Sequence, residues 1–154
     1  MEPTLQKGMH VAAKRVTAGD LSRGDIVIIR KGEDDWVMRL AALPGDRIAL
    51  VDGTVVLNGE PVEQRAAGRR TYFDGYEDRE AAILVERLPG EGRAHRILDT
   101  GQSPADDMPE IELGPDRYFV LGDNRDNAAD SRHPNPFGLG IVRGEQIRRR
   151  VQLD

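Results

Sequence analysis

The chain has 154 residues, a length that suits one domain with its own hydrophobic core. It contains no cysteine, which excludes disulfides and a thiol nucleophile, and its net charge of −5 argues against a nucleic-acid-binding protein. No apolar run approaches the roughly 18 residues of a membrane span and no basic-then-apolar leader is visible, so we expect the chain as given to be soluble.

The pattern of the first 63 residues predicts a series of short strands separated by strong turn signals. Residues 9–16 and 25–30 are predicted strands, and we expect them to pair with each other. Residues 34–43 lead into the turn Pro44-Gly45-Asp46, after which residues 47–51 resume the apolar pattern. The dipeptides Asp52-Gly53 and Asn58-Gly59 then enclose residues 54–57 and favour two tight hairpins.

Residues 64–114 differ in character, because polar stretches and chain breaks replace the regular strand pattern. We interpret them as a smaller β-rich subdomain inserted into a core formed by residues 1–63 and 115–154. Within the insertion, residues 81–88 and 94–98 are predicted strands, and a short helix over 77–85 is the alternative. The fold class is therefore all-β and mainly antiparallel.

The last part of the chain returns to the core pattern. Aromatic and β-branched residues make 117–121 a clear strand, which leads into the polar loop 122–132. Alternation in the final segment, 139–151, is expected to place Arg148 and Arg150 on a solvent-exposed face.

Four short stretches stand out along the chain, and they read MEPTL (1–5), GDIV (24–27), MRLAALPGD (38–46) and GDNRDNAADSR (122–132). In this order they resemble the conserved boxes of type I signal peptidases, the membrane-anchored serine endopeptidases that remove signal peptides. The last box matches at nearly every position. The residues that carry the match are Met1, Pro3, Thr4, Leu5, Gly24, Asp25, Arg39, Pro44, Gly45, Asp46, Gly122, Asp123, Asn124, Arg125, Asp126, Asp130, Ser131 and Arg132.

The resemblance implies a serine nucleophile activated by a lysine general base. That lysine must be neutral, so it is buried against apolar surface, where desolvation lowers its pKa. A second serine, from the last box, holds the amine in place, and hydrogen-bond donors beside the nucleophile stabilise the oxyanion. The substrate is expected to add to a sheet edge as an extended strand, with small pockets for alanine-like side chains.

The chain departs from this pattern at the catalytic positions. Met38 stands where the lysine is expected, Ala128 replaces the orienting serine, and the nucleophilic serine of the motif would precede Met1. Methionine fills the slot of a lysine stem without an amine. Loss of the partner hydroxyl follows, because an unpaired polar group in an apolar site costs about 1–3 kcal/mol. We expect at most residual catalysis.

Other catalytic arrangements are less well supported. The three serines (Ser22, Ser103, Ser131) and three lysines (Lys7, Lys14, Lys31) lie in turn-like or charged settings, so a replacement dyad is not expected. The histidines, His10, His95 and His133, lack metal-ligand spacing. The aspartates of the last box are interpreted as structural, with Asp130 pairing with Arg132 or Arg125. Trp36 and Val37 are expected in the core rather than in a membrane-facing patch.

Three hypotheses about function remain open. The first is a shortened or disabled signal peptidase, whose full-length form carries an N-terminal anchor and the missing serine. The second is a natural pseudopeptidase that begins at Met1 and binds extended Ala-rich segments without cutting them. The third is a β-rich interaction domain whose likeness is only architectural. Shortening explains the missing serine but not Met38 or Ala128, whereas a pseudopeptidase explains all three.

The resemblance also implies partners and a location. The expected partner is a signal peptide or another extended segment with an Ala-x-Ala-like site, and neither a cofactor nor a metal is expected. The family is anchored in the bacterial plasma membrane with its domain on the outer face, so contact with the membrane surface is expected through the anchor of a full-length protein.

Overall fold

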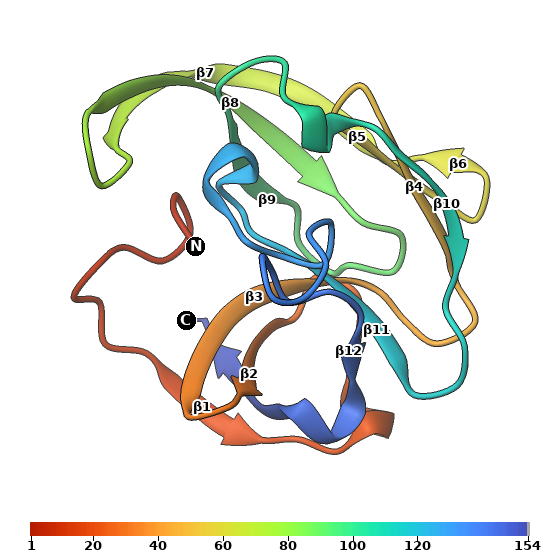
Figure 1. Cartoon of the computed structure of the whole chain (residues 1–154). Coiled ribbons are helices and arrows are strands. Elements are labelled where there is room, and N and C mark those ends of the chain that lie inside the picture. Colours follow the sequence, from red (N-terminus) through yellow and green to blue (C-terminus); the bar gives the residue numbers. More distant parts are fainter. Residues whose placement is uncertain (154) are drawn as a thin grey trace.

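The computed structural model describes residues 1–153, and its regular structure is almost entirely antiparallel β-strand, which confirms the predicted fold class (Figure 1). Four short 3-10 turns interrupt the strands within these residues. The strands are β1 (Ala12–Arg15), β2 (Ile26–Lys31), β3 (Asp34–Ala42), β4 (Arg47–Val51), β5 (Thr54–Leu57), β6 (Glu60–Pro61), β7 (Glu63–Phe73), β8 (Asp78–Arg87), β9 (His95–Asp99), β10 (Met108–Glu112), β11 (Arg117–Leu121), β12 (Val142–Arg143) and β13 (Ile147–Gln152). The turns are η1 (Ala18–Asp20), η2 (Pro104–Asp106), η3 (Arg125–Asn127) and η4 (Gly144–Gln146).

The largest sheet has the order β1-β13-β2-β3-β11-β12. The expected pairing of the first two strands is wrong, because β13 lies between β1 and β2 and pairs with both. A strand's composition specifies its extended backbone but not which distant strand will occupy its edge. The last strand of the chain therefore lies between its first two strands.

The second sheet has the order β10-β4-β5-β6, and both of its predicted hairpins are confirmed. Asp52 and Gly53 have φ of 48° and 77°, and Asn58 and Gly59 have φ of 53° and 85°. Positive φ at both turn positions is the type I′ geometry that matches strand twist. The local dipeptides thus determine these turns.

The third sheet, β7-β8-β9, arches over the rest of the molecule (Figure 1). The helical alternative is wrong, because residues 78–87 form β8, and the polar segment 64–70 is also a strand, in β7. Strand β10 pairs with β4 and so belongs to the second sheet. The division into a core and an inserted subdomain, residues 64–114, remains a prediction.

Strands β3 and β11 are the centre of the core, because their alternating side chains enter two different clusters. Ala42, Phe119 and Leu121 belong to the cluster shared with the second sheet. Met38, Leu40 and Val120 belong to the cluster enclosed by the first sheet, against which Trp36 also packs. Strand β3, which carries Met38 and Arg39, and strand β11, which leads into the loop 122–132, are therefore held on both faces.

A β-bulge in β13 changes the expected arrangement of the terminal arginines. Ile147 pairs with Ile29 and Arg149 with Ile28, so Arg148 is the extra residue. Arg148 and Arg149 are both exposed, whereas Arg150 is half-buried and donates to the carbonyl of Asp20 at 2.9 Å. The predicted exposure of Arg148 is therefore confirmed, whereas that of Arg150 is wrong. Among residues 1–153, no helix has the length and apolar character needed to span a bilayer.

Candidate active site

The side chain of Met38 lies inside the apolar cluster of the first sheet. It is 7% exposed and sits opposite Val27 of β2. The cluster also contains Leu40 and Val120, whose alternation places them on the same face as Met38. The environment is therefore the desolvated one that would lower the pKa of a lysine, but a thioether has no proton to exchange.

The methyl of Ala128 packs against Gly122, the residue that directly follows β11. Leu121 pairs with Arg39, and continuing this register by one step would set Gly122 opposite Met38. A Cβ added to Gly122 would lie 2.4 Å from the Cβ of Ala128, so the methyl of Ala128 occupies the space that Gly122 leaves empty. Opposed Cβ atoms in an antiparallel pair lie about 4.5–5.5 Å apart, so this register predicts that Met38 and Ala128 are neighbours.

The guanidinium of Arg39 joins residues from all four boxes. It forms two 2.7 Å bonds with the carboxylate of Asp123 and donates at 2.7 Å to the carbonyl of Gly24. It also donates to the Thr4 hydroxyl at 3.3 Å, and this hydroxyl donates to Asp123. Arg39 and Asp123 are buried, so their bidentate pairing is needed to compensate the desolvation of both charges.

The N-terminal residues are thereby held next to the boxes that surround Met38. The amide of Leu5 donates to the carbonyl of Met1 at 3.0 Å, which closes a turn around Pro3. Glu2 lies 3.7 Å from Arg70 of β7, so the turn also contacts the arching sheet.

The loop 122–132 is organised by Asp130, as its structural interpretation predicts. The carboxylate of Asp130 accepts from the amide of Gly122 at 3.0 Å and pairs with Arg132 at 2.9 Å. Arg132 also donates to the carbonyl of Arg125. The hydroxyl of Ser131 accepts a 2.9 Å bond from the amide of Val120. These bonds fix the loop that carries Ala128.

Residues of the loop also contact the third sheet. Asp126 accepts from the amide of Thr100 at 2.7 Å, and the backbone of Asn124 bridges to Leu98 of β9. Arg125 pairs with Glu86 rather than with Asp130. The last box therefore connects the predicted core to the predicted insertion.

The remaining box residues hold the turns around the site. Gly24 has φ +90°, and a Cβ there would lie 2.5 Å from the side chain of Glu91. Asp25 accepts from the amide of Ser22 at 2.9 Å. In the turn after Pro44 and Gly45, Asp46 pairs with Arg23 at 2.7 Å. Burial would raise the pKa of Asp46, but hydrogen bonds from Arg23, Asn58 and the Leu43 amide outweigh it and lower that pKa.

A buried charge cluster in the third sheet was missed from the sequence. His95 lies between Glu91, with Nδ1 to Oε1 at 2.8 Å, and Glu86, with Nε2 to Oε1 at 3.3 Å. Glu91 lies 3.6 Å from Arg39, so the cluster reaches the junction of the four boxes. The only signal in the sequence is Glu86 directly after the apolar run Ile83–Leu84–Val85.

The pKa values in this cluster follow from its pairing. Burial would raise the pKa of Glu86, but Arg125, His95 and Gln64 hold it well below its ordinary value. Burial would lower the pKa of His95, but the carboxylates of Glu86 and Glu91 outweigh this effect and raise it. The two carboxylates therefore favour the charged imidazole more than burial opposes it.

The serines and lysines that remain are engaged elsewhere. Ser103 caps the turn η2, and Ser131 supports the backbone of β11. The Lys31 ammonium donates to the carbonyl of Gly138 at 2.7 Å and lies 5.5 Å from the ring centre of Trp36. Lys7 and Lys14 are exposed. None of these lysines has the buried, apolar setting that the dyad chemistry requires.

The family model described as "Signal peptidase, peptidase S26" matches residues 1–153. Signal peptidase I of Bacillus licheniformis is 29% identical over 96% of this chain and 67% of its own length. Signal peptidase I of Rickettsia prowazekii is 32% identical over 94% of this chain and 56% of its own length. Signal peptidase I T of Bacillus subtilis is 32% identical over 96% of this chain and 64% of its own length. The chain thus spans between about half and two thirds of these relatives.

A crystal structure of a signal peptidase I from Enterococcus faecalis V583 overlaps 83% of this chain and 93% of that chain, at 21% identity and a TM-score of 0.46. The match to the family model extends from the first box through the last and includes the third sheet. On that match, the chain belongs to the signal peptidase family, peptidase S26.

Proposed function

We propose that this domain binds extended peptide segments with small side chains, as in signal peptides, and does not cleave them by a Ser/Lys mechanism. The observation that carries the proposal is the buried thioether of Met38, the residue that we assign to the position of the family's general base. A serine hydroxyl attacks a carbonyl only when a base accepts its proton, and a thioether is not such a base.

The second substitution supports the same conclusion. We infer from the register of β3 with β11 and from the contact of Ala128 with Gly122 that Ala128 lies close to Met38. On our assignment of the two positions, the amine of the family dyad and the hydroxyl that orients it are both replaced by apolar groups. A coordinated change keeps the site packed and leaves no polar group unpaired there. By contrast, the framework around the site is intact, since Arg39 still joins all four boxes.

The substrate class and location rest on the family. The Bacillus and Rickettsia relatives are signal peptidases, and we propose that this domain meets the same class of exported polypeptides. On the same precedent, we place it at the outer face of the bacterial plasma membrane, held there by an anchor of the full-length protein. A shortened or disabled signal peptidase and a natural pseudopeptidase both fit these statements.

The first experiment incubates the protein with a pre-protein that bears an Ala-x-Ala site and follows cleavage by mass spectrometry. We expect no cleavage, together with saturable binding of an Ala-x-Ala peptide and weaker binding of a matched peptide with Asp-x-Asp at the same positions. Cleavage that survives further purification and the variant Ser131→Ala would refute the non-cleaving proposal. Equal binding of the two peptides, or none, would refute the peptide-binding proposal.

A second experiment restores the dyad. The variant adds a serine before Met1 and combines it with Met38→Lys and Ala128→Ser, and we expect measurable cleavage to appear. The matched control keeps the added serine and Ala128→Ser but leaves Met38 unchanged, and it should stay inactive. If the folded triple variant is also inactive, then these positions are not what separates the chain from an active peptidase.

A further inference from the structure

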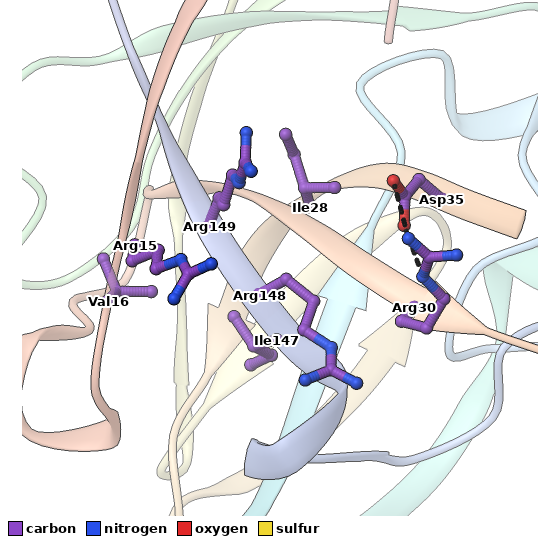
Figure 2. A pocket seen from close by; sticks show the side chains of 8 residues that line it. All are labelled: Arg15, Val16, Ile28, Arg30, Asp35, Ile147, Arg148 and Arg149. Carbon is purple, nitrogen blue, oxygen red and sulfur yellow. Dashed lines mark hydrogen bonds and ion pairs between the residues drawn. The ribbon is translucent and has the colours of Figure 1, made fainter.

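A groove of about 550 Å³ opens on the first sheet, away from the candidate active site (Figure 2). It is lined by four arginines, Arg15, Arg30, Arg148 and Arg149, together with Asp35 and three aliphatic residues. Its size falls within the roughly 300–1,000 Å³ typical of sites for small molecules.

The arginines line one groove because of the bulge in β13. Arg15 of β1 pairs in register with Arg149, and Arg149 pairs with Ile28 of β2. The extra residue, Arg148, breaks the alternation, so two consecutive arginines line the same groove. A regular strand would have pointed one of them toward the opposite face of the sheet.

Most of this positive charge is not compensated. Arg30 is paired with Asp35 at 2.8 Å, and Figure 2 shows this pair at one end of the groove. Arg15, Arg148 and Arg149 have neither an ion-pair nor a hydrogen-bond partner for their guanidinium groups among residues 1–153. The whole chain carries a net charge of −5, so this concentration of arginine runs against the overall balance.

The aliphatic floor of the groove strengthens the electrostatic attraction of its arginines for anions. Ile28 and Ile147 line it with aliphatic groups, and charge in a concave site with low-dielectric walls attracts counter-ions more strongly than on a flat surface. Guanidinium groups bind phosphate oxygens in a planar, bidentate manner. Several unpaired guanidinium groups around one cavity are therefore suited to a phosphate group.

We propose that this groove, which we call the arginine groove, binds a phosphate-bearing anion, either a lipid headgroup or a soluble phosphate. The site is separate from the one around Met38. Val27 and Met38 face the apolar cluster, whereas Ile28, one residue along β2, lies on the other face with the arginine groove. Val16 and Ile147 also line the groove and pack in the cluster that contains Met38, but none of the four arginines belongs to that cluster. The arginines can therefore be replaced without changing a residue of the Met38 cluster.

The first probe is inorganic phosphate, titrated at constant ionic strength against backbone amide NMR signals. We expect saturable shifts at Ile28 and Arg149. Arg148→Gln with Arg149→Gln should raise the dissociation constant by about tenfold or more. The matched control, Arg65→Gln with Arg96→Gln, removes two exposed arginines that flank Val85 in the third sheet and should leave binding unchanged.

The second probe is co-sedimentation with vesicles of phosphatidylglycerol and phosphatidylcholine, compared with phosphatidylcholine alone. Vesicle binding that requires phosphatidylglycerol and is lost in the arginine-groove variant identifies a lipid headgroup, whereas saturable phosphate binding without vesicle binding identifies a soluble ligand. Arg148→Lys with Arg149→Lys keeps the charge and should bind more weakly than the native protein, which provides a second variant if the glutamine pair does not fold. No saturable binding of either probe, or equal losses in the control pair, would overturn the proposal.

Discussion

Replacing Met38 by lysine would show directly whether the candidate site is the desolvated pocket that a general base requires. The native side chain is 7% exposed and belongs to an apolar cluster with Val27, Leu40 and Val120. A lysine in such a place loses the hydration of its ammonium group, and burial lowers its pKa. The variant should therefore fold less stably at neutral pH, in a way that depends on pH.

The magnitude follows from the shift in pKa. If burial lowers the lysine pKa by about 3 units from about 10.4, the free energy of unfolding falls by about 4 kcal/mol at pH 7. The folded pKa lies below the unfolded one, so the penalty is complete below the folded pKa and vanishes above the unfolded pKa. At pH 9 about 2 kcal/mol should remain, and near pH 11 almost none.

The assay is urea unfolding of the native protein and Met38→Lys between pH 6 and pH 10. Met9→Lys is the matched control, because Met9 is 53% exposed and the same substitution there should cost little at any pH. Adding Ala128→Ser to Met38→Lys should recover about 1 kcal/mol through a hydrogen bond to the amine, whereas Ala128→Ser alone should destabilise. A Met38→Lys penalty below about 1 kcal/mol that does not change with pH would refute the buried-base geometry.

Three further predictions concern the framework around the site. Asp123→Asn leaves the buried charge of Arg39 unpaired and should lower the free energy of unfolding, measured by urea denaturation, by about 3 kcal/mol. A loss under about 1 kcal/mol would contradict a buried, coupled pair. Gly122→Ala should lower the melting temperature, because the added Cβ would collide with the Cβ of Ala128. Gly19→Ala is the control and should not lower it, because the space around Gly19 is open. Similar melting temperatures for the two variants would be evidence against the close contact of Gly122 with Ala128. Because the pKa of His95 is raised in the folded state, the stabilisation by its charged form is complete below about pH 6.5 and is lost as pH rises through the raised pKa. The melting temperatures of the native protein and His95→Gln should therefore converge between pH 6 and pH 9. A gap that stays constant over this range would argue against a charged imidazole.

The hairpins and most strands were predictable because their signals are local. Asp52-Gly53 and Asn58-Gly59 adopt the positive φ angles that their turn type requires, and β11 begins and ends where its aromatic and β-branched run does. The polar strand β7 was missed, because its stability comes from a long pairing with β8 rather than from its own composition.

The candidate site was partly predictable for a similar reason. The four boxes marked Arg39, Asp123, Gly24 and Thr4, and the structure brings these residues together at one guanidinium group. That Arg39 would be the common partner was not visible, because its contacts lie up to 84 positions apart in the chain.

The sequence by itself determined the extended backbone, the tight turns and the presence of an apolar residue at position 38. Only the tertiary structure decided that β13 would lie between β1 and β2, that Arg125 would pair with Glu86, and that the bulge would place Arg148 and Arg149 in one groove. The physical reason is one of range. Backbone conformation depends on neighbouring residues, whereas strand partners, register and the pairing of buried charges depend on which distant segments can be packed together without leaving polar groups unsatisfied.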